Sequence, residues 1–208
     1  MKKDKGTYHH GNLADSLLDA VDELASQFGL EAVTLRACAK KIGVSPSSAF
    51  RHYSDKRDLL TAFATRALRQ LASELSAANQ KASEVKKDAD AATNADALVA
   101  VGLAYISFAI DKPAFFRAMW NEETLYTNDE SYVAAADKLG SYLKGGFADA
   151  IVDTDPDSLS SEELIAWSSV HGLANLFVDG PIGKHLSREQ KLTMATDMLT
   201  TLKPVFTA

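Results

Sequence analysis

The sequence predicts an all-α fold, and three observations lead to that prediction. Apolar residues recur every three or four positions along almost the whole chain, which is the spacing of one helix face. Almost no segment alternates apolar and polar residues as a half-buried strand would. Residues that cap or end helices separate these stretches. Because 46% of the 208 residues are hydrophobic, the chain can bury a substantial core.

The first expected helix begins after Asn12, a good N-terminal cap, and ends at Gly29. Two short helices follow, and a tight Gly-Val-Ser turn joins them. Thr34 caps the first of the two, over residues 35–42, and Ser45 caps the second, which begins with a proline at a tolerated position. Two short helices joined by a glycine-containing turn and braced by a longer helix are typical of a helix-turn-helix.

A long fourth helix is expected after Ser54, with a buried stripe. Residues 77–97 are rich in alanine and polar side chains, so the helix either continues there or gives way to a loose connection. We divide the chain into a head, residues 1–60, and a body, residues 61–208. The expected stripe consists of Leu60, Phe63, Ala64, Ala67, Leu68, Leu71 and Leu75.

The sequence of the body predicts further helices. Residues 96–111 are apolar on two stripes, so this helix should be central. A short helix should begin at Pro113, and Gly180-Pro181 should break the chain near its end. The remaining helices are expected at 129–152, 160–179 and 187–203.

Charge and composition narrow the classes of protein. The net charge of −6 argues against a general nucleic-acid coat protein, yet residues 1–70 carry 11 Lys and Arg against 8 Asp and Glu. A slightly basic head on an acidic body fits a protein that touches phosphates at one end, although chance unevenness is the alternative. No long apolar run or secretory signal is recognised, and the single cysteine points to a reducing cytoplasm.

The second short helix has the chemistry of a major-groove reader. We expect Ser47, Ser48 and Arg51 to point outward, where arginine can bind guanine and serine can contact several bases. Nearby cations and helix N-termini suit phosphate oxygens. A solvated surface is the alternative. The expected DNA contacts are Thr34, Arg36, Ser45, Ser47, Ser48, Phe50, Arg51, His52 and Lys56.

The segment TLRACAKKIGVSPSSAFRHYSDKRDLL, Thr34 to Leu60, resembles the DNA-binding head of the TetR family of transcriptional regulators. The resemblance covers about residues 8–70 and rests on many positions at fixed spacing. Two positions depart from the family pattern: Phe50 and Arg51 stand where tyrosine is frequent. Phe50 lacks the tyrosine hydroxyl, which puts one hydrogen bond to a DNA phosphate in doubt. Arg51 changes which bases the helix can recognise.

A second segment, AWSSVHGLANLFVDGPI, is similar to a TetR-type C-terminal domain marked by Trp-x-x-x-His-Gly, here Trp167, His171 and Gly172. The resemblance implies that the last two helices form a four-helix bundle with a second copy of the chain. The residues agree, because each helix carries a stripe that needs a partner. These stripes are Ile165, Ser169, Gly172 and Leu176, and Leu192, Ala195, Leu199 and Leu202.

Aromatic residues of the body could line a ligand pocket or simply fill the core. Trp167 and His171 share a helix face, either as a pocket wall or as a packed pair whose histidine bonds a carbonyl. Both interpretations, a pocket wall and a packed pair, stay open. The expected ligand-binding group is Tyr105, Phe108, Phe115, Phe116, Met119, Trp120, Trp167 and His171, for a small, largely apolar ligand.

Taken together, these features predict a homodimeric, ligand-responsive transcriptional regulator, a repressor of a near-palindromic operator. We expect no membrane contact, no metal and no cofactor, and no phosphate-binding loop or nucleophile motif indicates an enzyme. Two alternatives stay open. One is a ligand-binding helical protein whose head binds another protein, and the other is a helical enzyme that uses His171.

Overall fold

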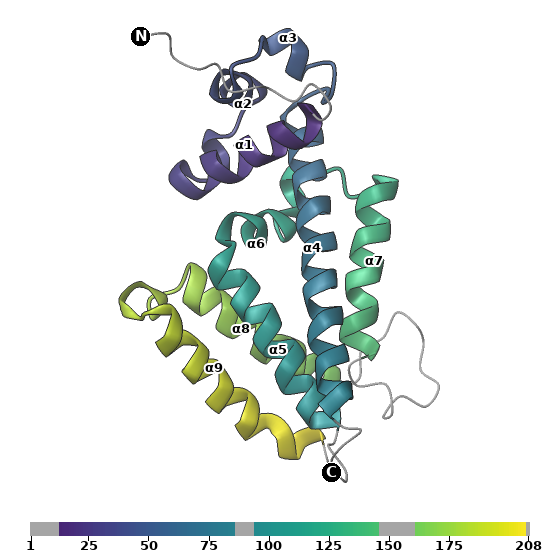
Figure 1. Ribbon diagram of the computed structural model, residues 1–208, viewed down its shortest axis with the longest axis vertical. Coiled ribbons are helices and arrows are strands. Elements are labelled where there is room, and N and C mark those ends of the chain that lie inside the picture. The colour runs from purple at the N-terminus through teal and green to yellow at the C-terminus, as the bar shows by residue number, and fades with distance from the viewer. Residues whose placement is uncertain (1–12, 86–93, 146–160, 207–208) are drawn as a thin grey trace.

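The computed structural model describes residues 13–85, 94–145 and 161–206, and within these ranges the chain is helical without a strand (Figure 1). This confirms the predicted fold class. The head contains α1 (Leu13–Phe28), η1 (Leu30–Ala32), α2 (Leu35–Ile42) and α3 (Pro46–Ala49), and α4 (Lys56–Val85) leads out of it. The body contains α5 (Asn94–Asp111), α6 (Pro113–Met119), η3 (Glu122–Thr124), α7 (Glu130–Gly145), α8 (Ser161–Val178), η4 (Gly183–His185), α9 (Arg188–Leu202) and η5 (Lys203–Phe206).

Local sequence signals set the helix ends in the head. Gly29 and Gly43 take positive φ angles of 84° and 75°, which side chains disfavour, and they end α1 and α2. The hydroxyls of Thr34 and Ser45 cap α2 and α3 as expected. The cap of α4 differs from the prediction: Asp55, rather than Ser54, accepts the Asp58 N–H through its side chain.

The recognition segment, residues 46–53, is less regular than the single helix expected there. The α-helix itself ends at Ala49. A further turn continues to Tyr53, because the N–H groups of His52 and Tyr53 both donate to the Ala49 carbonyl. Figure 1 shows α3 at one end of the molecule, away from α8 and α9. The described helices of the body therefore do not cover this segment.

Helix α4 runs from the head along the body and packs against α1, α5, α6 and α7 (Figure 1). The whole stripe expected on this helix is buried. The Ala-rich stretch begins as a continuation of α4 through Val85, and residues 86–93 lie outside the described part of the chain. Because one continuous helix joins head and body, a displacement at one end can be carried to the other.

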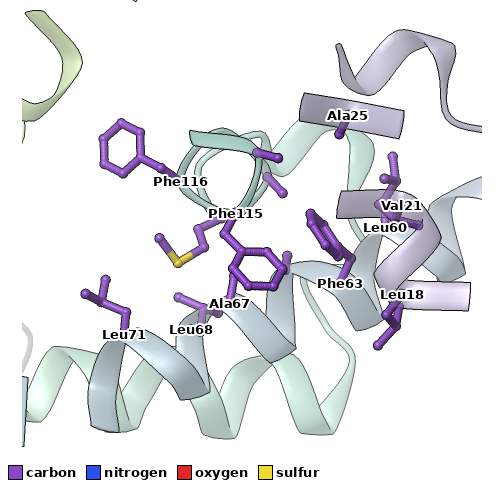
Figure 2. Packing of buried hydrophobic residues seen from close by; sticks show 14 of the residues in the cluster. Leu18, Val21, Ala25, Leu60, Phe63, Ala67, Leu68, Leu71, Phe115 and Phe116 are labelled. Carbon is purple, nitrogen blue, oxygen red and sulfur yellow. The ribbon is translucent and has the colours of Figure 1, made fainter. Parts of the chain in front are cut away.

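Head and body share one apolar core. Figure 2 shows Phe63 of α4 beside Phe115 of α6, with Val21 of α1 close by. The ring centroids of Phe63 and Phe115 are 4.6 Å apart, and all three side chains are buried. Burying side chains of this size contributes roughly 1.5–3 kcal/mol each. The position of α1 is therefore coupled to that of α6.

Helix α5 is central, as its two apolar stripes predict, since it packs against α4, α6, α8 and α9. The stripe expected on α9 is covered in part by this chain itself, while its Leu192 and Leu202 stay half-buried. Its Ala195 and Leu199 are fully buried within this chain, and a Cβ on Gly102 of α5 would lie 3.0 Å from Leu199. The close approach of α5 and α9 thus depends on that glycine.

The described body helices follow the predicted order, with shifted ends. The helix expected at 96–111 begins two residues earlier, at Asn94, and the one expected at 129–152 is described from Glu130 to Gly145. Residues 146–160 lie outside the described ranges. Among the described helices none alone is long and apolar enough to cross a membrane, and only α5 and α6 together, which meet at a bend of 107°, meet that criterion.

Candidate nucleic-acid interface and ligand cavity

The outer face of the recognition segment carries a row of hydrogen-bonding side chains one helical turn apart. The Ser48 N–H donates to Ser45 Oγ at 3.2 Å, and the two hydroxyl oxygens lie 2.8 Å apart. Arg51 Nη2 donates to Ser48 Oγ at 3.2 Å. These contacts hold the guanidinium beside the helix without burying it. The exposed Ser45 and Arg51 and the half-buried Ser48 therefore place two hydroxyls and a five-donor cation on one side of the segment.

The inner face of the same segment fixes it to the head. Ala49 is fully buried, and the buried Tyr53 donates its hydroxyl proton to the Ala14 carbonyl at 3.4 Å. Burial raises the pKa of Tyr53 to about 12, so its phenol stays neutral. Phe50 differs from both, because 47% of its surface is exposed. The segment therefore presents an outer face that is polar except for one aromatic ring.

The other expected DNA contacts surround this face. Thr34, Arg36 and His52 are exposed, and the Thr34 hydroxyl accepts the Ala37 N–H at 3.0 Å. Lys56 is only half-exposed, since its Nζ donates to the Glu31 carbonyl at 3.0 Å. That contact joins the start of α4 to η1. Lys56 is therefore positioned by the head and keeps further N–H donors for a phosphate.

The segment that links α6 to α7, residues 120–129, is tied to the start of α4, which sequence reasoning missed. Arg57 Nε donates to the Leu125 carbonyl at 2.8 Å, and its guanidinium lies 4.7 Å from the Tyr126 ring centroid. The Tyr126 N–H donates to Thr61 Oγ1 at 2.8 Å, and its hydroxyl donates to Asp55 Oδ2 at 2.7 Å. This 120–129 segment therefore touches α4 beside the head.

The hydrogen bond between Tyr126 and Asp55 determines the protonation states of the two side chains. The Asp58 N–H and the Tyr126 hydroxyl both donate to the Asp55 carboxylate, which lowers the pKa of Asp55. The same bond raises the pKa of Tyr126, because it favours the protonated phenol. At neutral pH the pair is a carboxylate that accepts from a neutral phenol.

A cavity of about 400 Å³ lies in the body, where α4, α6, α7 and α8 meet with the 120–129 segment. Three of the expected ligand-binding residues, Met119, Trp120 and Trp167, line it. The α7 wall and two further residues of the 120–129 segment, Glu122 and Thr127, are not among the expected residues, although 132, 136, 139 and 140 have helical spacing that indicates a common face. The full lining is Leu68, Met119, Trp120, Glu122, Thr127, Tyr132, Val133, Ala136, Asp137, Leu139, Gly140 and Trp167.

A second group of expected residues lies behind the tryptophans. The Tyr105 hydroxyl and His171 Nδ1 are 2.8 Å apart, and His171 stacks on Trp167 with ring centroids 5.5 Å apart and planes within 1°. Burial lowers the pKa of His171, so its imidazole is neutral at pH 7. His171 does not line the cavity, and its partner is a hydroxyl rather than the carbonyl considered above.

The remaining expected ligand-binding residues belong to the core and not to the cavity lining. Phe108 and Phe115 stack with ring centroids 6.3 Å apart, and Phe116 meets Tyr105 edge to face. All three phenylalanines are buried, and none lines the 400 Å³ cavity. These rings join α5 and α6 to α4 rather than forming a cavity wall.

Helix α8 exposes an apolar face in the single chain. Ile165 is 42% exposed and Leu176 is 43% exposed, and both belong to the expected stripe. Between them lies Gly172, where an added Cβ would meet nothing within 4 Å. The described part of the chain thus leaves this face open to a partner surface.

Comparison with known proteins identifies two matching family models. The one described as "Bacterial regulatory proteins, tetR family" matches residues 17–63. The one described as "Tetracyclin repressor-like, C-terminal domain" matches residues 98–201. An uncharacterized HTH-type transcriptional regulator of Bacillus subtilis (strain 168), YobS, is 29% identical over 102 residues, or 49% of this chain and 48% of that protein. The match therefore spans about half the length of that relative.

Solved structures show the same fold over nearly the whole chain. A protein of unknown function from Rhodococcus sp. RHA1 superposes with a TM-score of 0.71 at 23% identity, covering 94% of this chain and 97% of that one. The transcriptional regulator FadR from Bacillus subtilis, in complex with stearoyl-CoA, superposes with a TM-score of 0.65 at 13% identity, covering 90% and 96%. At these identities the likeness is one of fold.

Proposed function

The chain belongs to the TetR family of bacterial regulatory proteins, and from this premise we propose that it is a homodimeric, ligand-responsive transcriptional repressor. The observation that carries the proposal is the outer face of the recognition segment. Ser47 and Arg51 are exposed there, and Ser48 holds the guanidinium by a hydrogen bond. A short rod with such a face can enter the major groove, where arginine binds guanine through two parallel hydrogen bonds.

The neighbouring groups support contact with the DNA backbone. Thr34 and Ser45 stand at the N-termini of α2 and α3, and Arg36 and Lys56 supply cations near them. Phosphate contacts of this kind fix the register of a protein on the duplex but carry no sequence information. We therefore assign sequence reading to Ser47, Ser48 and Arg51 and positioning to the residues around them.

The exposed face of α8 supports assembly with a second copy. Its apolar Ile165 and Leu176 flank Gly172, which allows another helix to approach closely. A two-fold dimer places two recognition segments on one side of the assembly. Such heads bind half-sites roughly 34–36 Å apart, or a multiple of one helical turn, which requires a near-palindromic operator.

The cavity supports a response to a small molecule. Its lining includes Glu122 and Thr127, on either side of the residues that bond Arg57 and Thr61 of α4. A ligand that moves the 120–129 segment therefore acts on α4 next to the head. A complete switch between the two forms of the protein requires a difference in ligand binding of about 5.5 kcal/mol. The related FadR fold, solved in complex with stearoyl-CoA, supports ligand binding by this architecture.

The proposal is tested by footprinting and gel-shift measurements on the DNA upstream of the gene itself. We expect one protected, near-symmetric site. Arg51→Ala should relax base preference at one or two positions in each half-site and cost about 1–3 kcal/mol there. Arg69→Ala, which removes an exposed cation from the body part of α4, is the matched control and should leave the preference unchanged. If Arg51→Ala keeps the full base preference, Arg51 does not recognise the DNA sequence.

A further inference from the structure

The opening of the 400 Å³ cavity carries negative charge. Glu122 on η3 and Asp137 on α7 are both exposed members of the lining, and they come from two different elements. None of the lining residues is Lys, Arg or His. Among the described residues no cationic side chain forms an ion pair with either carboxylate. A cation at the opening would therefore meet two carboxylates without displacing a partner of either.

The walls behind this opening are aromatic. Trp120 and Trp167 meet edge to face, with ring centroids 5.3 Å apart and planes at 73°, so together they form a corner. Tyr132 adds a third ring from α7. Burial and the nearby Glu122 carboxylate raise the pKa of Tyr132, so its phenol is neutral. Tryptophan and tyrosine rings attract cations through their negative faces, with tryptophan the strongest.

The inner surface is apolar. Leu68 of α4, Met119 of α6 and Leu139 of α7 are all buried and line the cavity. The volume is that of an ordinary small-molecule site. An occupant therefore has an apolar body that lies against these side chains and a cationic group that lies between the aromatic rings and the carboxylates.

From this arrangement we propose that the cavity binds an organic cation, an amine or quaternary ammonium group on an apolar body of modest size. The proposal rests on the proposed ligand-responsive function and names the class of its ligand. A carboxylate, phosphate or sulfonate ligand would meet two like charges and no cation of the lining. Electrostatic repulsion and the cost of desolvating an unpaired anion both oppose such a ligand.

The test uses the fluorescence of the chain's own tryptophans. The chain contains two, Trp120 and Trp167, and both line the cavity, so occupancy changes the emission of the full-length protein directly. The probe is benzyltrimethylammonium, and benzylsulfonate is an anion of similar size and shape. We expect a saturable change with the cation, confirmed by calorimetry, and at least tenfold weaker binding of the anion, about 1.4 kcal/mol.

Matched variants distinguish the effect of the two lining carboxylates from the effect of the overall negative charge of this region. Glu122→Gln combined with Asp137→Asn should weaken binding of the cation roughly tenfold, because each exposed charge contributes a few-fold. Glu123→Gln combined with Glu130→Gln removes two neighbouring charges that do not line the cavity, and it should leave binding unchanged. The melting temperature of each variant shows that it is folded.

Three results would overturn the assignment: no saturable change with the cation, equal binding of cation and anion, or equal weakening by the two double variants. DNA binding is measured separately on the same ligand-free protein. A chain that binds its operator but ignores the cation contradicts only the ligand class. A chain that binds the cation but no operator contradicts the proposed function instead.

Discussion

The contact that Lys56 makes with the Glu31 carbonyl bears on what its substitution should do to DNA binding. Its ammonium group donates to the Glu31 carbonyl, so the side chain joins α4 to the head while it faces the expected path of the DNA backbone. Lys56→Ala should therefore weaken binding to all DNA sequences alike and lower the slope of log affinity against log salt by about one. Titrations at several salt concentrations measure this slope. A loss of affinity confined to one operator sequence would contradict a phosphate role.

The lowered pKa of His171 predicts how the melting temperature of the protein changes with pH. Because burial lowers its pKa in the fold, the unfolded chain binds the proton more readily once the pH falls below about 6.5. The His171 imidazole therefore does not reduce the free energy of unfolding above that pH, and it reduces this free energy as the pH falls below it. Between pH 7.5 and 5.5 the melting temperature of His171→Gln should decline less than that of the parent. His185→Gln, at an exposed position, is the control and should follow the parent.

Residue-level signals in the head were sufficient to predict its local structure. Thr34 and Ser45 are caps that act on N–H groups three residues away, and Gly29 and Gly43 supply backbone angles that few other residues adopt. The cap of α4 could not be chosen this way, since Ser54 and Asp55 are adjacent and both residue types cap well. Only the direction of the chain entering α4 decides between them.

The 120–129 segment bonds the body directly to the start of α4. Tyr126→Phe removes the hydrogen bond to Asp55 but keeps the ring that lies against Arg57. We expect faster amide hydrogen exchange in residues 125–127 and in the first turn of α4, since the bond holds these two elements together. Tyr142→Phe on α7 is the matched control. Unchanged exchange in both places would show that the bond does not restrain them.

Helix periodicity identifies an apolar face but not the surface that covers it. The apolar stripe on α9 predicts a partner helix from a second chain, yet its Ala195 and Leu199 are buried within this chain, and Leu199 lies against Gly102 of α5. Likewise, Phe108 and Phe115 fill the core rather than line the cavity. The contacts of the 120–129 segment join residues more than sixty positions apart, so no local pattern indicates them.

The exposed apolar face of α8 predicts that the protein is a dimer. Leu176→Glu places a charge on the exposed apolar face and should convert a dimer into a monomer, because an unpaired charge is costly to bury at an interface. Sedimentation velocity measures the change. Phe28→Glu alters a more exposed apolar residue in the head and should leave the dimer intact. A dimer that persists in Leu176→Glu places the interface elsewhere.

The arrangement of head and body indicates how a bound ligand can act on the head. The 120–129 segment, which forms part of the cavity lining, bonds to Asp55, Arg57 and Thr61 at the start of α4, shortly after the recognition segment. The shared core around Phe63 and Phe115 adds a second contact between α6 and α1. A ligand that prefers one arrangement of these elements shifts the heads without touching DNA.

Selection of binding sites from a pool of random duplexes tests whether the exposed face of residues 46–53 reads the DNA sequence. The parent protein should enrich a near-palindromic sequence with two half-sites about one helical turn apart, or a multiple of that spacing. Arg51→Ala should enrich a site that has lost its preference at one or two base pairs of each half. If the parent protein enriches no symmetric sequence, or if both proteins enrich the same sequence, the exposed face of residues 46–53 does not read the DNA.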